Sequence, residues 1–123
     1  MKTKIFCHGI LKNKEDKILF LKRNKNKLYG ELWDLPGGKL EENEDYQKCI
    51  VREFKEETNI NVKVDKFIDV KAQIYNNNII IVLIFLVTPL NPYNILLNDE
   101  HIDYIFEKAI DLNECIWYLK KLM

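Results

Sequence analysis

Three glutamates, Glu53, Glu56 and Glu57, lie three and four residues apart in the segment REFKEE. In a helix, side chains at these spacings converge on one patch of the surface. Clustered carboxylates are hard oxygen ligands that suit Mg²⁺ or Mn²⁺, which keep some waters and accept phosphate oxygens as further ligands. No His or Cys spacing argues for zinc. The residues therefore predict a divalent-cation site, with Mg²⁺ expected and Mn²⁺ as the alternative.

A helical wheel at about 100° per residue places Glu53 and Glu57 inside an apolar sector, with Glu53 deepest and Glu56 on the border. The apolar members of that sector are Tyr46, Cys49, Ile50 and Phe54. Carboxylates among apolar side chains are expensive unless a positive charge meets them. Because Arg52 can answer only one of them, a bound divalent cation is the expected counter-charge.

The helix that carries these glutamates has recognisable ends. Asn43 is the expected N-cap, and Glu44 and Asp45 are favourable in the first turn. The helix is predicted to end near Thr58, and Asn59 then takes the position of a left-handed C-cap. Upstream, the pair Gly37-Gly38 lets the chain turn tightly and bring carbonyls near a ligand.

Around this helix, strands are predicted at residues 4–11, 17–22, 32–35, 61–75, 79–87 and 101–106. The first two are expected to form a hairpin, and residues 61–75 and 79–87 another across three asparagines. The run IIIVLIFLV is nearly continuous, so its strand should be central and covered on both faces. Residues 111–122 form an amphipathic pattern that predicts a second helix. Mixed strands with two helices indicate an α/β fold.

The stretch from Gly38 to Ile60 resembles the box of the Nudix hydrolases. Glu44, the run REFKEE and Asn59-Ile60 follow Gly38 at the spacing of the pattern G-x5-E-x7-R-E-U-x-E-E-x-G-U, where U is bulky and apolar. Only the last glycine differs, and Asn59 is the best substitute for glycine at a C-cap. The resemblance covers most of the chain and implies an α/β/α sandwich, with a mixed β-sheet between helices, as one domain over residues 1–123.

The resemblance also implies a reaction, in which water attacks one phosphorus of a nucleoside diphosphate linked to another group. The implied metal ligands are Glu53, Glu56, Glu57 and the backbone carbonyl of Gly38. Arg52 is expected to orient Glu53, and Glu44 to support the site. Glu53 is the first choice as general base, and Glu100, in the loop before the last strand, is the second.

Substrate contacts are assigned more loosely. Arg23 follows the second strand, where relatives often hold a phosphate-contacting arginine, and Lys39 follows the glycine turn. Trp33 and Tyr29 are candidates to stack on a base, although aromatic residues in such segments more often pack. The alternative for Arg23 and Lys39 is a solvated loop residue. His8 and His101 lack partners at catalytic spacing and are interpreted as structural.

The best single interpretation is a nucleoside triphosphate cleaved to monophosphate and pyrophosphate. A nucleoside diphosphate sugar or a dinucleoside polyphosphate is the nearest alternative substrate. A nucleotide sensor without turnover is the alternative of another class, and it predicts the loss of a metal ligand, which is not observed.

Bulk properties agree with a single globular domain, since the chain has 123 residues and is 47% hydrophobic. The formal net charge is zero, so nucleic acid is not an expected partner. No apolar run is long enough for a signal peptide or a membrane span. The three cysteines are widely spaced and form no CxxC motif, so they are expected to be reduced. The expected location is the cytoplasm, and a homodimer is compatible with the sequence without being indicated by it.

Overall fold

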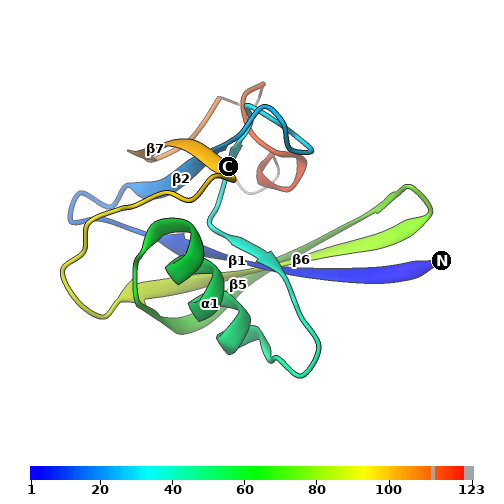
Figure 1. The fold of residues 1–123 in the computed structure, drawn as a ribbon, viewed down its shortest axis with the longest axis horizontal. Helices are drawn as coiled ribbons and strands as arrows, with labels where there is room; N and C mark the ends of the chain where they lie inside the picture. Colours follow the sequence, from blue (N-terminus) through cyan, green and yellow to red (C-terminus); the bar gives the residue numbers. More distant parts are fainter. Residues whose placement is uncertain (112, 121–123) are drawn as a thin grey trace.

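The computed structural model describes residues 1–111 and 113–120, and Figure 1 shows their arrangement. In this part of the chain, no helix has the length and apolar character needed to cross a membrane. The elements follow in the order β1 (Lys2–Leu11), β2 (Ile18–Arg23), β3 (Trp33–Asp34), β4 (Gly37–Lys39), α1 (Tyr46–Thr58), β5 (Val62–Tyr75), β6 (Asn78–Pro89), β7 (His101–Glu107) and the 3-10 helix η1 (Trp117–Leu119).

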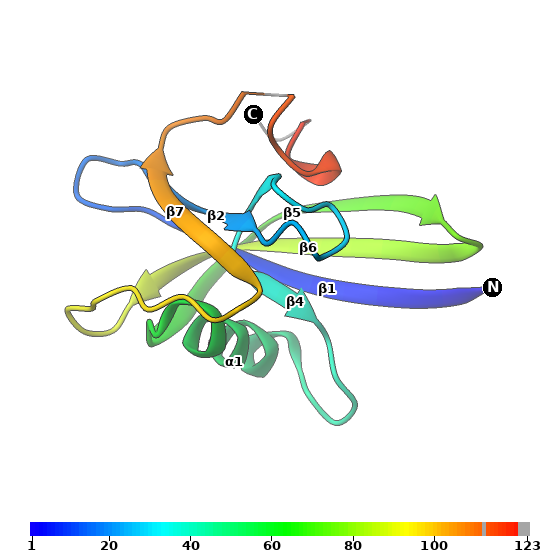
Figure 2. The same cartoon turned by 45° about the horizontal axis from the view of Figure 1, so that its top comes forward.

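Two sheets form the framework. The four-stranded sheet has the order β4-β1-β6-β5, in which β1 and β6 run parallel and the other neighbours antiparallel. The antiparallel three-stranded sheet has the order β3-β2-β7. Figure 2 shows α1 and the C-terminal segment around η1 on opposite sides of the larger sheet. The predicted α/β fold with a mixed sheet is therefore confirmed.

Strand β6 lies inside the larger sheet and feeds a hydrophobic core on each of its faces. Phe85 and Val87 pack in the core that contains the buried side of α1. Val82 and Ile84 pack in the second core, together with buried residues of the C-terminal segment. Alternation along the strand sends neighbouring side chains to opposite faces. The sequence-based expectation of a central strand covered on both faces is confirmed.

The predicted C-terminal helix over residues 111–122 is wrong in the part that the structure describes. Cys115 bridges to Trp33, and the only helical turn there is η1. The backbone explains the difference: the Trp33 N–H donates to the Glu114 carbonyl at 2.7 Å, and the Ile116 N–H donates to the Trp33 carbonyl at 2.9 Å. These groups pair with the edge of β3 instead of closing helical turns. Leu112 and residues 121–123 lie outside the described residues.

Of the two hairpins predicted from the sequence, the one between β5 and β6 is confirmed and the one between β1 and β2 is wrong. Strands β5 and β6 pair across Asn76 and Asn77, whose φ angles of 50° and 60° suit the turn type that hairpins favour. The chain does turn at residues 13–17 between β1 and β2, but the two segments are joined there by one isolated β-bridge, from Lys12 to Ile18. Each then enters a different sheet, because β1 has its edges taken by β4 and β6.

Candidate active site

Helix α1 begins two residues later than expected. Asp45 is the N-cap, and its side chain accepts a hydrogen bond from the Lys48 N–H at 2.8 Å, while Asn43 adopts a φ of 62° before it. At the other end, Asn59 adopts the left-handed conformation, with a φ of 64°, and its N–H donates to the Lys55 carbonyl. The expected asparagine C-cap is confirmed, so its departure from the Nudix pattern has a structural explanation.

The buried side of α1 holds apolar residues and carboxylates together. Glu57 is 2% exposed, whereas the side chains of Glu53 and Glu56 are 12% and 54% exposed. Glu53 and Glu57 therefore point inward as the wheel predicts, but Glu57, not Glu53, is the deepest. Glu56 lies at the rim. The apolar residues beside them are fully buried: Cys49, Ile50 and Phe54.

The glycine pair lies directly over these carboxylates. The Gly37 N–H donates to Glu57 Oε1 at 2.9 Å, and a Cβ at Gly37, where φ is 150°, would lie 2.3 Å from the Cys7 carbonyl oxygen. A Cβ at Gly38 would lie 2.5 Å from the Glu53 carboxyl group. Both distances are far below van der Waals contact. The missing side chain at Gly37 lets β4 lie close against β1, and the missing side chain at Gly38 leaves the space that the Glu53 carboxyl group occupies.

Arg52 ties several of the acidic groups together. Its guanidinium donates to both oxygens of Glu44, at 2.7 and 3.0 Å, and to Glu53 Oε1 at 2.7 Å. The paired bonds hold Glu44 in a bidentate geometry and lower the pKa of its carboxyl group to about 2. Arg52 thus fixes the orientation of Glu53 but is shared among neighbours. None of these hydrogen bonds joins Arg52 to Glu57.

Glu57 lies near the first residue of β7 and the residue that precedes it. Ligand atoms of Glu57, Glu100 and His101 all lie within 4.8 Å of one another, and we call these residues the glutamate–histidine cluster. His101 is 4% exposed, and burial lowers the pKa of its imidazole to about 4, so the ring is neutral near pH 7. Burial raises the pKa of Glu57 well above its usual range, and the charges of Glu53 and Glu100 raise it further.

The donor set of this region fits a divalent cation. A buried carboxylate faces a neutral imidazole and further carboxylates, so the negative charge is not matched by the protein groups around it. Carboxylate oxygens and an imidazole nitrogen at these separations are groups that bind divalent metals. The pKa of Glu57 is raised because burial and the neighbouring carboxylates disfavour its ionised form. A cation bound beside Glu57 would stabilise that ionised form.

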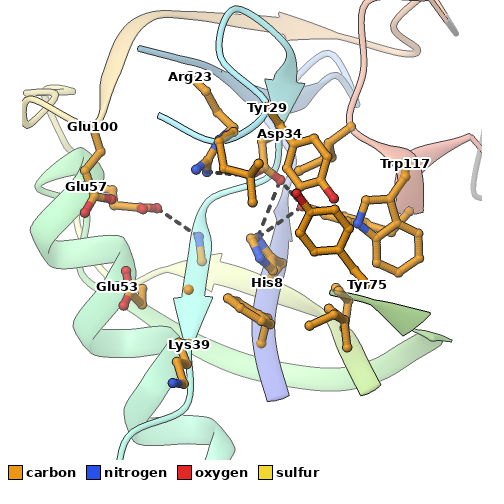
Figure 3. Close-up of a pocket in the computed structure, with 18 of the residues that line it drawn as sticks. His8, Arg23, Tyr29, Asp34, Lys39, Glu53, Glu57, Tyr75, Glu100 and Trp117 are labelled. Carbon is orange, nitrogen blue, oxygen red and sulfur yellow. Dashed lines mark hydrogen bonds and ion pairs between the residues drawn. The ribbon is translucent and has the colours of Figure 1, made fainter. Parts of the chain in front are cut away.

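A cavity of about 440 Å³ opens from the carboxylates. Figure 3 shows Glu53, Glu57 and Glu100 on one side of it, and Tyr29, Tyr75 and Trp117 on the other. Of the residues that the sequence proposes for substrate contact, Lys39, Arg23 and Tyr29 line the cavity. Trp33 does not line it and instead contacts Lys22, whose amine lies 5.7 Å from the ring. Arg23 is held by Asp34 at 3.4 Å and by the Leu28 carbonyl at 2.7 Å.

A second buried polar group also lines the cavity and is formed by His8, Asp34 and Tyr118, which we call the tyrosine–aspartate cluster. The Tyr118 hydroxyl donates to Asp34, and it lies 3.1 Å from His8 Nδ1. His8 Nδ1 also lies 2.8 Å from the Leu35 carbonyl oxygen. Burial raises the pKa of Asp34, while the adjacent Arg23 opposes that shift.

Sequence reasoning missed several cavity residues, and the reasons differ. His101 directly follows Glu100 in the run NDEH, so its position beside a candidate acid was a usable signal. Asp34 sits in the WDLPGG approach to the box but carries no spacing signal of its own. Trp117 and Tyr118 fall in the segment that was assigned to a helix, and nothing in the sequence placed them near β1 and β3.

The family model described as the NUDIX domain matches residues 6–120. The chain belongs to this family. It is 32% identical over 80 residues to an 8-oxo-dGTP diphosphatase of Proteus vulgaris, an alignment that covers 65% of this chain and 71% of the relative. Together with the box and the fold, these matches identify a MutT-like Nudix hydrolase.

Solved structures agree on the fold. A MutT protein from Methanosarcina mazei Go1 superposes with a TM-score of 0.84 at 23% identity, covering 98% of this chain and 89% of that one. An ADP-ribose pyrophosphatase from Streptococcus suis superposes with a TM-score of 0.67 at 20% identity, covering 89% and 75% of the two chains. Both matches extend over most of this Nudix hydrolase, including the segments on each side of the box.

Proposed function

We propose that this Nudix hydrolase cleaves a nucleoside triphosphate to a nucleoside monophosphate and pyrophosphate, with a divalent cation as cofactor. The observation that carries the proposal is a single cavity with a carboxylate side and an aromatic side (Figure 3). Its volume of about 440 Å³ lies within the usual range for small-molecule sites. The name of the Proteus relative makes 8-oxo-dGTP the first substrate to test.

The proposed cation ligands are Glu53, Glu56, Glu57 and the carbonyl of Gly38. A divalent cation bound there neutralises phosphate charge and lowers the pKa of an attacking water. Glu53 is the proposed general base, because Arg52 holds one of its oxygens at 2.7 Å and burial raises the pKa of its carboxyl group. Glu100, on the same side of the cavity, is the second candidate.

The rest of the cavity supplies binding groups. Lys39 and Arg23 approach from opposite sides of the cavity and are the proposed contacts for phosphate oxygens. Tyr29 and Tyr75, with ring centroids 6.3 Å apart, and Trp117 offer faces on which a base can stack. A triphosphate at the carboxylates and a base at these rings would lie along the cavity.

The decisive experiment is a substrate panel with Mg²⁺ and with Mn²⁺: 8-oxo-dGTP, dGTP, ADP-ribose, a nucleoside diphosphate sugar and a dinucleoside polyphosphate. We expect monophosphate and pyrophosphate from a triphosphate, with heavy oxygen from labelled water on one of these products. Faster cleavage of the sugar nucleotides or dinucleotides would transfer the assignment to those substrates. Tight binding of a nucleotide without any product would favour the sensor.

Matched variants connect this activity to the site. Glu53→Gln and Glu57→Gln each preserve shape while removing a carboxylate, and both should lower turnover by orders of magnitude. Glu42→Gln makes the same change at an exposed residue of the loop before α1 and should leave turnover unchanged. Turnover near that of the unmodified enzyme in both site variants would refute the proposed mechanism.

A further inference from the structure

His101 is buried in an unusual way. Its side chain is 1% exposed, and neither ring nitrogen has a hydrogen-bond partner among the described residues. Buried polar atoms are nearly always hydrogen-bonded, because an unpaired one has given up its hydrogen bonds to water without replacing them. A buried imidazole without a partner therefore needs an explanation.

The position of His101 is imposed by the backbone around it. It is the first residue of β7, where it pairs with Arg23 across an irregularity in the register of β2. Its N–H donates to the Asn98 carbonyl at 3.4 Å, which closes the turn that also presents Glu100. The ring is thus held next to α1 by main-chain contacts, independently of any bond that the ring itself makes.

The Oε2 atom of Glu57 lies 4.0 Å from His101 Nδ1. This distance is too long for a hydrogen bond. It suits two ligands of one metal ion, since metal–nitrogen and metal–oxygen bonds are each about 2.0–2.2 Å long. The carboxylate of Glu100 completes a group whose ligand atoms all lie within 4.8 Å.

We propose that His101 binds a metal through a ring nitrogen, with Glu57 and Glu100 as oxygen ligands, and that this nitrogen makes the enzyme favour Mn²⁺ or Co²⁺ over Mg²⁺. Imidazole suits transition metals, whereas Mg²⁺ takes oxygen ligands almost exclusively. The proposal rests on the proposed function only in placing a divalent cation beside Glu57. It adds a ligand from outside the glutamates of α1 and a consequence for ion selectivity.

The first test observes the ligand directly and needs no substrate. The chain has two histidines, so the imidazole nitrogen NMR spectrum contains signals from His101 and His8 only. Zn²⁺ is a diamagnetic probe that binds imidazole. One His101 nitrogen should shift on addition of Zn²⁺, while His8, whose Nδ1 already contacts the Leu35 carbonyl, serves as the internal reference. An unshifted His101 at saturating Zn²⁺ would overturn the proposal.

The second test measures selectivity by calorimetric titration with Mn²⁺ and with Mg²⁺. In His101→Asn and His101→Phe, the ratio of Mn²⁺ to Mg²⁺ affinity should fall by roughly tenfold or more. Asp99→Asn changes an exposed acid next to the cluster and is the matched control. An unchanged ratio in a folded His101 variant would overturn the proposal, and the asparagine variant provides a measurement if the phenylalanine does not fold.

Failure of this proposal is distinguishable from failure of the proposed function. If the ratio does not change but Glu57→Gln still abolishes triphosphate hydrolysis, the nitrogen ligand is refuted and the enzyme assignment stands. If His101 shifts and controls selectivity in a protein that hydrolyses no nucleotide, the metal site stands and the proposed reaction is refuted.

Discussion

Two polar clusters lie on either side of the cavity, and they differ in how their buried groups are paired. In the tyrosine–aspartate cluster, Tyr118 donates to Asp34, and His8 contacts the Leu35 carbonyl. In the glutamate–histidine cluster, neither His101 nitrogen has a hydrogen-bond partner within residues 1–111 and 113–120, and burial raises the pKa of Glu57. The polar groups of the tyrosine–aspartate cluster therefore bond to one another and to the backbone, whereas the ring nitrogens of the glutamate–histidine cluster remain available to a ligand.

The difference indicates different roles. A fully paired buried network stabilises one arrangement of the segments that supply it, here β1, β3 and the C-terminal segment. A cluster of unpaired ligand atoms costs stability and is retained where it binds something. We therefore expect changes in the glutamate–histidine cluster to affect activity and metal response, and changes in the tyrosine–aspartate cluster to affect mainly stability.

The largest effect is expected for Glu57→Gln. Changes next to metal ligands alone cost roughly ten- to a hundredfold, so loss of a buried ligand should lower kcat by more than about a hundredfold. The amide oxygen can still accept the Gly37 N–H, so the fold should persist. Steady-state kinetics with circular dichroism checks both points. Equal losses of activity and secondary structure would contradict the assigned role.

Arg52→Lys should have the next largest effect. Lysine keeps the charge but cannot bond Glu44 and Glu53 in the same forked geometry. We expect kcat to fall by roughly ten- to a hundredfold with a smaller change in KM, because Glu53 is misplaced but not removed. Lys48→Met, an exposed change on the same helix, is the control. A variant that retains full kcat would show that Glu53 needs no positioning.

Tyr118→Phe examines the paired cluster. Removing the hydroxyl leaves buried Asp34 without this donor, and we expect a loss of about 1–3 kcal/mol in the free energy of unfolding, measured with urea. Tyr104→Phe, at an exposed position of β7, should change stability far less. A large loss of kcat in folded Tyr118→Phe protein would break the proposed division between the clusters.

The stability of the metal-free protein should depend on pH through Glu57. The folded protein raises the pKa of Glu57 above 4.5. Between pH 4.5 and this raised pKa, the folded protein therefore binds more protons than the unfolded chain. Stability is thus lost as pH rises above 4.5, by at most about 1.4 kcal/mol per pH unit for this group. Relative to wild type in chelator, Glu57→Gln should gain stability as pH rises, and a difference that does not change with pH would refute the raised pKa of Glu57.

The smallest effect is expected outside both clusters, at the C-cap. Asn59→Gly restores the family pattern at a φ of 64° and should change stability by less than about 1 kcal/mol, with activity unchanged. Asn59→Ala should cost about 1–2 kcal/mol, because a Cβ without a local hydrogen bond is strained there. Thermal unfolding measures both. A loss of activity in Asn59→Gly would show that the asparagine has a role beyond the cap.

Predictions from the sequence succeeded where contacts are local along the chain. The inward direction of Glu53 and Glu57 and the asparagine C-cap follow from helical periodicity and backbone preference over a few residues. The β5–β6 hairpin succeeded for the same reason, since its asparagine turn is local. The pairing of Arg52 with Glu53 was implied by the resemblance to the Nudix box. The wheel ranked the depths of Glu53 and Glu57 wrongly, because burial depends on what packs against the helix.

Local sequence patterns did not predict the contacts between segments that are distant along the chain. The expected hairpin of β1 and β2 failed because other strands occupy the edges of β1. The expected C-terminal helix failed, in its described part, because its backbone groups pair with β3. Amphipathic spacing reports which residues are buried, as Cys115, Ile116 and Leu119 are, without stating which backbone bonds form.

The sequence by itself determined the family, the class of reaction and the helix that carries Glu53, Glu56 and Glu57, because these depend on residue types at fixed local spacings. Only the tertiary structure decided that His101 and Glu100 face Glu57, and that Tyr118 completes a network with Asp34 and His8. Those neighbours are brought together by sheet order and register, which sum weak preferences over the whole chain. The proposed metal selectivity and the shape of the aromatic side of the cavity therefore depend on packing rather than on the motif.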